Sequence, residues 1–176
     1  MEFFDAIAER YCHKAAFRSD PVPDAHLRKI GEAGMYAPSP NNVQACEFVI
    51  VNDRDTLQRI GEIAGSVPLC TAPAMIVLAA DHHREAKGSP RYLEDYACAT
   101  TQMLLAATAL GYGAGWVDGM FRDPAKRTPV CGLLGIPDDR LMIVIVPVGL
   151  PAVDGPRRPK KPFEQRASWN CYTIER

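Results

Sequence analysis

The sequence predicts an α+β fold in which one sheet is covered by helices on both faces. Three apolar runs have the length and β-branched composition of strands, at residues 47–52, 74–80 and 141–146. Residues 74–80 are apolar on both alternating faces, which is typical of a central strand covered on two sides. Stretches with helical periodicity separate these runs. With 176 residues, 47% of them hydrophobic, the chain is long enough to build one core.

The N-terminal part predicts two helices. Apolar residues recur at helical spacing over residues 2–11, and Asp24 is placed to cap a second helix. Pro38 and Pro40 disfavour helical dihedrals in the residues before them, so this second helix should end near Tyr36. The residues expected to share its buried face are Leu27, Ile30, Gly34 and Met35.

A polar loop over residues 36–48 follows. Ser39, Asn41, Asn42 and Gln44 offer hydroxyl and amide groups that donate and accept hydrogen bonds without carrying charge. Such groups suit a polar heteroaromatic ligand. Proline, serine and asparagine also form ordinary surface turns, so both interpretations stand at this point.

A strand and a third helix come next. Residues 47–52 are expected to form a buried strand, because Phe48-Val-Ile-Val51 is apolar and β-branched. Asp53 or Asp55 is placed to cap the helix that follows. The apolar face of this helix is predicted to carry Leu57, Ile60 and Ile63.

The longest helix is predicted over residues 92–110. It has little polar surface, so we expect it to be the central buried helix, ended by Gly111 as its C′ residue. Two segments before it, 65–73 and 81–90, are expected to be irregular and polar connections on either side of the central strand.

Turn signals divide the region after this helix. Asp118-Gly119 marks a turn. Thr128-Pro129 matches a cap followed by proline at the first helical position, which predicts a short helix that Gly135 ends. Pro147 is expected to mark the end or an edge of the strand at 141–146.

Residues 151–176 differ from the rest of the chain. The part from 151 to 166 is rich in proline and in basic residues, so it should lie on the surface or reach a partner. Residues 169–174 have the composition of a strand. Such an arm cannot easily bury Trp169 and Tyr172 by itself, which suggests that it docks on a second subunit.

Composition and charge exclude several classes of protein. The formal net charge is −1, so the overall field favours neither nucleic acid nor an anionic membrane. No targeting segment follows Met1 and no apolar run reaches the ~18 residues of a membrane span, which predicts a cytoplasmic protein. The six cysteines lack C-x-x-C spacing and are expected to be reduced thiols, mostly buried. Asp81-His-His83 has no second cluster at ligand spacing, so no metal is predicted, and His13 is expected to point to solvent.

Three motifs occur in order along the chain. Arg10-Tyr-Cys-His-Lys-Ala-Ala-Phe17 follows the first helix, and Ala37-Pro-Ser-Pro-Asn-Asn-Val-Gln44 fills the loop. Ala109-Leu-Gly-Tyr-Gly-Ala-Gly-Trp116 comes later with Asp118-Gly119, and Arg158-Pro-Lys-Lys-Pro162 lies in the tail. Together they resemble the FMN-dependent nitroreductase family in its short form, from about Ile7 to about Trp169.

The first motif is similar to the family's R-x-S-x-[KR]-x-F. The resemblance implies that it grips the FMN phosphate and ribityl chain, with Arg10, Tyr11, Cys12 and Lys14 as cofactor-binding residues. Arg10 suits this role because its planar fork binds phosphate in a bidentate manner. Lys14 would place positive charge near the flavin N1 and O2 and so favour reduction. Cys12 stands where the family usually has serine.

The second motif is similar to the family's A-P-S-x-x-N-x-Q-P-W. The resemblance implies that this loop reaches the flavin across a dimer interface. The cofactor contacts would be Pro38, Ser39, Pro40, Asn42 and Gln44. Ala45-Cys46 replaces the usual Pro-Trp, a change that either opens the pocket or is repacked.

The third motif is similar to the family's L-G-x-G-x-x-W and its late K-x-R-K-P. The resemblance implies that Trp116 contacts the cofactor, and that Asp118 and Gly119 sit at the redox edge, where a backbone N–H hydrogen-bonds the flavin N5. Arg158 and Lys160 take the positions of the tail's phosphate-binding bases. The catalytic set is thus Lys14, Asp118 and Gly119.

The resemblance also implies an architecture and an activity. The fold would be a nitroreductase-like three-layer α/β/α arrangement with a central mixed, mostly antiparallel sheet. Residues 1–150 would be the FMN-binding domain, and residues 151–176 an arm, exchanged in a homodimer, that completes the phosphate site. NAD(P)H would be the transient electron donor and a nitroaromatic or quinone the acceptor, in a ping-pong mechanism. Because the segment 81–90 is short, we expect an exposed flavin face.

Two alternatives remain open from the sequence. One is a flavin-binding redox sensor or carrier without NAD(P)H turnover. The other is a specialised family member that dehalogenates its substrate or consumes the flavin itself. The sequence selects neither NADH over NADPH nor the physiological acceptor.

Overall fold

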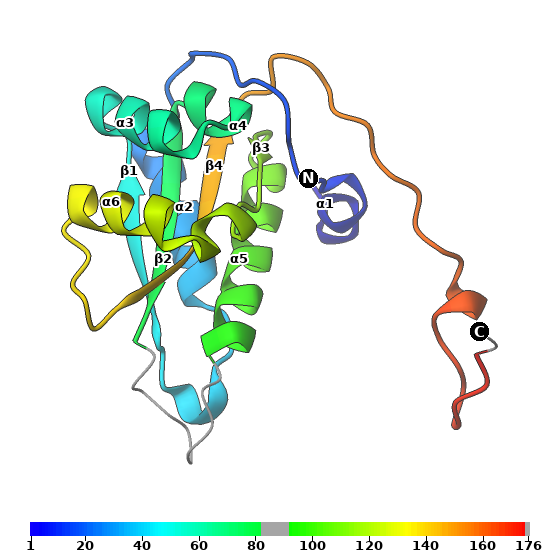
Figure 1. The fold of residues 1–176 in the computed structure, drawn as a ribbon. Coiled ribbons are helices and arrows are strands. Elements are labelled where there is room, and N and C mark those ends of the chain that lie inside the picture. The colour runs from blue at the N-terminus through cyan, green and yellow to red at the C-terminus, as the bar shows by residue number, and fades with distance from the viewer. Residues whose placement is uncertain (82–91, 175–176) are drawn as a thin grey trace.

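The computed structural model describes residues 1–81 and 92–174 and has three layers (Figure 1). The described strands form one sheet in the order β1-β2-β4-β3, and each pairs with its neighbour antiparallel. Their bounds are β1 Cys46–Val51, β2 Ala74–Ala80, β3 Gly113–Ala114 and β4 Leu141–Gly149. An isolated parallel bridge joins Cys12 to Ala114 at the β3 edge. The predicted α+β fold with an antiparallel sheet between helices is confirmed.

Helices cover both faces of this sheet. The α-helices are α1 Phe3–Glu9, α2 Asp24–Met35, α3 Arg54–Ala64, α4 Val67–Thr71, α5 Tyr92–Ala109 and α6 Pro124–Leu134. The 3₁₀ helices are η1 Pro40–Asn42, η2 Gly119–Arg122 and η3 Phe163–Gln165. Helices α2 and α5 pack on one face, while α3, α4 and α6 pack on the other. None of these helices is both long enough and apolar enough to span a bilayer.

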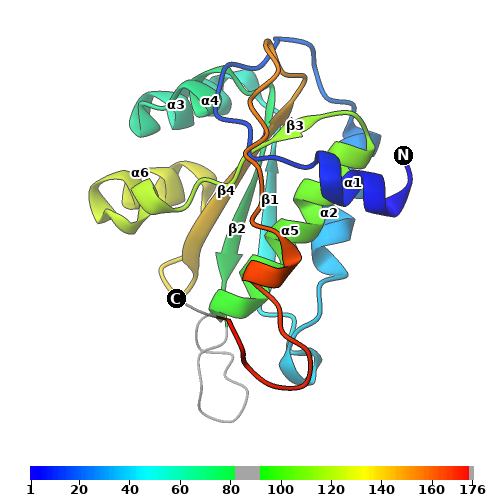
Figure 2. The same ribbon diagram turned by 90° about the vertical axis from the view of Figure 1, so that its right-hand side faces the viewer.

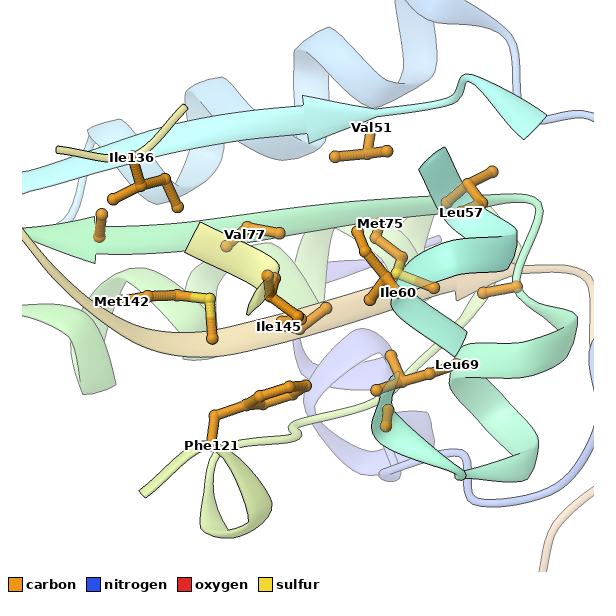
Figure 3. Packing of buried hydrophobic residues seen from close by; sticks show 14 of the residues in the cluster. Val51, Leu57, Ile60, Leu69, Met75, Val77, Phe121, Ile136, Met142 and Ile145 are labelled. Atoms are coloured by element: carbon orange, nitrogen blue, oxygen red, sulfur yellow. The ribbon is translucent and has the colours of Figure 1, made fainter. Parts of the chain in front are cut away.

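Two cores form because the side chains of β2 alternate between the two faces. Met75 and Val77 point toward α3, α4 and α6, where they meet Phe121 and Ile145 (Figure 3). Ala74, Ile76 and Leu78 join the core under α2 and α5. Every residue of β2 is at most 3% exposed, which confirms the prediction of a central strand covered on two sides.

Two helix predictions need correction. Residues 65–73 are not irregular, because α4 forms there and buries Leu69. Helix α6 begins at Pro124 rather than at Thr128, since the Asp123 side chain accepts a hydrogen bond from the Ala125 N–H at 2.9 Å and starts the helix earlier. Its predicted end at Gly135 is correct, with φ 65°.

Helix α2 also differs from the prediction in detail. Asp24 is its first residue rather than its cap, and the Asp24 carboxylate accepts from the Asn52 side chain at 2.8 Å. Met35 is 56% exposed and does not share the buried face. For α3, Asp53 is the cap and not Asp55, since it accepts from the Thr56 N–H at 2.9 Å.

The strands differ from the prediction in three places. Strand β1 is an edge of the described sheet and is only partly buried, with Ile50 40% exposed. Strand β4 continues through Pro147, whose carbonyl accepts from the Gly115 N–H at 3.1 Å, so this proline is not its end. Residues 169–174 are bends and irregular backbone rather than a strand, and none of the described strands pairs with them.

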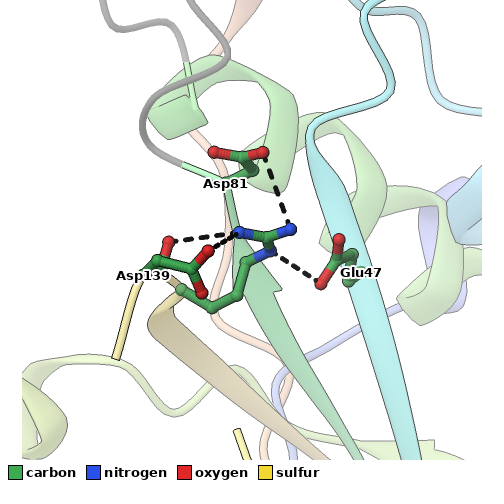
Figure 4. Close-up of polar contacts among 4 residues, drawn as sticks. Glu47, Asp81 and Asp139 are labelled. Carbon is green, nitrogen blue, oxygen red and sulfur yellow. Dashed lines mark hydrogen bonds and ion pairs between the residues drawn. The ribbon is translucent and has the colours of Figure 1, made fainter. Parts of the chain in front are cut away.

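Arg140 ties three strands together at one end of the sheet (Figure 4). Its guanidinium contacts Glu47 at 3.0 Å, Asp139 at 2.9 Å and Asp81 at 3.7 Å. The hydrogen bond to Glu47 and the charges of Asp139 and Asp81 raise the pKa of Arg140. The cluster thus joins the beginning of β1, the end of β2 and the beginning of β4.

Apolar side chains lie on the surface at both ends of the chain. The residues of α1 that were predicted to form an apolar face are exposed, with Phe4 at 80%. The C-terminal arm leaves the body beside α1 and ends away from the sheet (Figures 1 and 2). Its Trp169 and Tyr172 are 80% and 75% exposed. The predicted surface position of the arm is therefore confirmed.

Candidate functional site

The segment Arg10–Lys14 runs from the end of α1 along the β3 edge of the sheet. The His13 N–H donates to the Ala114 carbonyl at 2.9 Å, next to the bridge between Cys12 and Ala114. A Cβ atom on Gly115 would lie 3.0 Å from the His13 carbonyl oxygen, so this close approach favours glycine. Lys14 is exposed and Arg10 is half-buried. The structure thus brings the first and third motifs side by side.

His13 is buried, contrary to the prediction that it points to solvent. Only 1% of the residue is exposed, and the ring packs on Phe17 with centroids 4.5 Å apart. Its Nδ1 lies 3.2 Å from the Tyr11 hydroxyl and its Nε2 lies 3.0 Å from the Ala16 carbonyl oxygen. Both ring nitrogens therefore have polar partners inside the protein, which is what makes burial of the imidazole acceptable.

The beginning of the arm lies against the same segment. The Gly155 N–H donates to the Tyr11 hydroxyl at 3.4 Å. The Arg157 guanidinium lies 5.4 Å from the centroid of the Tyr11 ring and forms an ion pair with Glu9. Sequence reasoning assigned no role to Arg157 or His13. The sequence signal that could have revealed the contact of His13 with Tyr11 is their spacing of two residues, since alternate side chains of an extended segment share a side.

Four basic residues consequently lie on two segments that touch at Tyr11. Arg10 and Lys14 belong to the first segment, and the exposed Arg158 and Lys160 follow directly after Arg157 on the arm. Arginine and lysine side chains on neighbouring backbone favour an anion such as a phosphate group.

The turn after β3 carries the predicted redox-edge residues. Trp116 is half-buried, with its ring 5.8 Å from that of Tyr96. The Asp118 carboxylate pairs with Arg122 at 3.5 Å and lines a pocket of about 190 Å³. Burial and then the Asp118 charge raise the pKa of Tyr96, which sequence reasoning had not singled out. Gly119 begins η2, so the helix itself offers no acceptor for its N–H.

The polar loop lies elsewhere within this chain. Pro38, Ser39 and Gln44 line a pocket of about 350 Å³ between α2, β1 and α5. Figures 1 and 2 show the loop between α2 and β1 at the opposite end of the sheet from the turn around β3. A single chain therefore does not bring this loop together with the four basic residues.

Small side chains open the loop pocket at the position where the family has proline and tryptophan. Ala45 and Cys46 both line it, together with Phe48 and Ala99, so the space is not repacked. Ala45 is 2% exposed and forms part of the floor. Of the two outcomes expected for this replacement, the structure has the open pocket.

The prediction that the cysteines are mostly buried is wrong, since three are exposed and three, Cys46 in this pocket among them, are half-buried. Burial raises the pKa of Cys46 to about 12, and the charges of Asp95 and Cys98 act in the same direction. A thiol with so high a pKa is a poor nucleophile at neutral pH, so we predict that Cys46 serves as a small packed side chain.

Two predictions fall wholly or partly outside the described residues. His82 and His83, the histidines of the polar connection, lie there, as does most of the segment 81–90 that was expected to leave the flavin face open. Within residues 1–81 and 92–174, no group of three or more histidine, cysteine or acidic residues is placed to hold a metal ion.

Two known oxidoreductases are similar in sequence to most of this chain. A protein of Archaeoglobus fulgidus, provisionally named as an NADH dehydrogenase/NAD(P)H nitroreductase, is 33% identical over 131 residues, which are 74% of this chain and 75% of that one. An NADPH-flavin oxidoreductase of Vibrio harveyi is 25% identical over 168 residues, covering 89% of this chain and 69% of that protein.

A solved structure extends the likeness over nearly the whole chain. The protein of Parabacteroides distasonis, with the same provisional name, superposes with a TM-score of 0.83 at 27% identity and covers 97% of this chain and 98% of that one. The model of the nitroreductase family matches residues 7–69 and 67–150. With more than half of its length matched, the chain belongs to the nitroreductase family.

Proposed function

We propose that this protein is an FMN-dependent oxidoreductase that takes electrons from NAD(P)H and passes them to a nitroaromatic, a quinone or a similar acceptor. Bound FMN would accept a hydride from NAD(P)H and then reduce the second substrate, so one site would serve both in a ping-pong sequence. The observation that carries the proposal is the meeting of the basic segments at Tyr11, beside the glycine-rich edge of the sheet. The flavin named for the Vibrio harveyi relative supports it.

The residues of this chain fit the phosphate end of FMN. Arg10, Arg158 and Lys160 supply positive charge, and Arg10 can bind two phosphate oxygens at once. Glycine at position 115 lets the backbone of the first segment approach β3 closely, since a Cβ atom there would crowd the His13 carbonyl. Cys12 offers a weaker donor than serine, so we assign more of the phosphate binding to Arg10.

The turn after β3 would serve the ring end. The Gly119 N–H is exposed and lacks a helical acceptor, so it is available to a flavin nitrogen. Lys14 would stabilise negative charge that develops on the ring during reduction, and Asp118 would orient the turn through its contact with Arg122. No side chain need act as a general acid or base.

A homodimer would complete the site. The loop lies at the far end of the sheet in its own chain. Its residues that would contact the cofactor are Pro38, Ser39, Pro40, Asn42 and Gln44. Only a second copy can place that loop next to the basic segments. The exposed aromatic residues of α1 and of the arm support an interface of this kind.

An absorbance spectrum of the purified protein tests the proposal directly. We expect flavin bands, which bleach when NADH or NADPH is added without oxygen and return when a quinone or nitroaromatic follows. A flavin that neither nucleotide bleaches would favour the sensor or carrier. A colourless protein that FMN cannot reconstitute would overturn the proposed function.

A further inference from the structure

The hydrogen bonds around His13 form one chain with matched donors and acceptors. A carbonyl oxygen can only accept, so the hydrogen on His13 Nε2 is donated to Ala16. The Tyr11 hydroxyl accepts from the Gly155 N–H and donates its own hydrogen to His13 Nδ1. The chain therefore runs from the arm, through Tyr11 and His13, to the backbone of the N-terminal segment.

This chain of hydrogen bonds is fixed at both ends. The His13 backbone is held on β3 by its bond to Ala114, and the Ala16 carbonyl also accepts from the Ala152 N–H at 3.0 Å. On the arm side, a Cβ atom on Gly155 would lie 2.7 Å from the Tyr11 ring, so the arm backbone approaches the ring as closely as glycine allows. The imidazole thus connects the sheet edge, the first basic segment and the base of the arm.

The same contacts decide which way the basic side chains face. Residues 11 and 13 point inward, and in an extended segment their neighbours Arg10 and Lys14 take the other side. On the arm, Arg157 is held over Tyr11 and on Glu9, directly before Arg158. Fixing Tyr11 therefore fixes the spacing of the two basic pairs.

We propose that His13 is a positioning residue which, through Tyr11, holds the arm against the N-terminal segment so that Arg10 and the basic residues of the arm meet one phosphate group. The proposal rests on the proposed function only for the identity of the anion, the phosphate of FMN. His13 itself touches no ligand. Its effect should therefore depend on the phosphate and not on the flavin ring.

Tyr11→Phe and His13→Phe test this with little change of shape. In the protein without flavin, we expect amide hydrogen exchange of residues 155–158, where all but Pro156 carry an N–H, to rise about fivefold, because one link of the hydrogen-bond chain is lost. The Kd for FMN should rise by a similar factor, while the Kd for riboflavin, which lacks the phosphate, should not change. The double variant should bind FMN no more weakly than either single variant, because both substitutions break the same chain of hydrogen bonds.

The protein offers a matched control. The Tyr112 hydroxyl is hydrogen-bonded to His26 Nδ1 at 2.8 Å, which makes another tyrosine–histidine pair. None of the hydrogen bonds of the described arm residues involves this pair. Tyr112→Phe should leave the exchange of residues 155–158 and both affinities unchanged. His13→Gln can still donate to Ala16 but lacks the ring nitrogen that faces Tyr11, so it should resemble Tyr11→Phe.

Three outcomes would overturn the inference. Unchanged amide hydrogen exchange at residues 155–158 in both variants would show that the hydrogen bonds through Tyr11 and His13 do not hold the arm. Faster exchange with an unchanged ratio of FMN to riboflavin affinity would show a purely structural role. A wild-type protein that binds no FMN would overturn the proposed function and the phosphate assignment together, while the exchange data would still report on the arm.

Discussion

The charge of Cys98 contributes to the pKa of Cys46, but the two thiols differ in solvent exposure. Cys98 is exposed on α5, while Cys46 is partly buried in the loop pocket with its pKa raised to about 12. The thiolate is the reactive form, and at pH 8 only about one Cys46 thiol in 10⁴ is ionised at that pKa. The two thiols should therefore differ strongly in reactivity.

Alkylation with iodoacetamide at pH 8, followed by peptide mass spectrometry, checks this. Cys98 and the exposed Cys70 should be modified first, and Cys46 at least a hundredfold more slowly. Because the pKa of Cys46 is raised, its labelling should increase about tenfold per pH unit between pH 7 and 9. Equal rates for Cys46 and Cys98 would contradict the burial of Cys46 in the native protein.

Lys14 is the residue to which we assign charge stabilisation at the ring. Lys14→Ala should lower the rate of flavin reduction by NAD(P)H roughly tenfold, because an exposed ammonium group contributes less than a fully desolvated one. Anaerobic stopped-flow absorbance measures this rate. Lys29→Ala, which removes an exposed lysine from α2, serves as the control. Unchanged FMN affinity and reduction rate in Lys14→Ala would refute the role.

At the scale of elements, the packing of α3 on α4 depends on one glycine. A Cβ atom on Gly61 would lie 2.8 Å from the Cys70 Cα atom and 3.1 Å from the Leu69 carbonyl oxygen. These are backbone atoms, which cannot move aside as a flexible side chain would. Gly61→Ala should therefore lower the free energy of unfolding by about 1–3 kcal/mol, despite alanine's higher helix propensity.

Gly132 in α6 provides the comparison. It is also helical, but a Cβ atom there would meet no atom within 4 Å. Gly132→Ala should raise the free energy of unfolding by up to about 1 kcal/mol. Urea denaturation followed by circular dichroism measures both variants. A Gly61→Ala variant as stable as Gly132→Ala would mean that α4 shifts without cost.

At the scale of the whole molecule, the exposed aromatic residues of the arm predict self-association. The chain has a mass of 19.3 kDa, and we expect light scattering on a sizing column to give twice that value. Replacing both Trp169 and Tyr172 by serine should raise the dimer dissociation constant at least tenfold, because buried aromatic anchors dominate interfaces.

Val67→Ser is a suitable control for that experiment. Val67 is also exposed, at 58%, but it lies on α4 and not on α1 or the arm. Its replacement should not change the mass in solution. A wild-type chain that stays monomeric at every concentration would argue against a site shared between two copies.

Local sequence determined most of the elements of this fold. The strand at 74–80, the helices from 24 to 35 and from 92 to 109, and the ends at Gly111 and Gly135 all follow from short-range signals. Each signal acts within one turn or one strand: apolar periodicity, β-branched runs, or a glycine with positive φ. The candidate site residues were likewise named from short motifs, and the proposals made for them still require the experiments above.

Only the tertiary structure decided what depends on distant contacts. His13 is buried because Phe17, Tyr11 and the arm close around it, and no local pattern reveals that an extended segment will lie under residues 144 positions away. Strand β4 continues through Pro147 because its carbonyl still finds a partner on Gly115. Residues 169–174 form no strand, since a strand needs a pairing neighbour and none of the strands in the described part of the chain pairs with them. Secondary structure can be encoded locally, but burial and strand pairing are set by which surfaces meet, and that is determined by the whole chain.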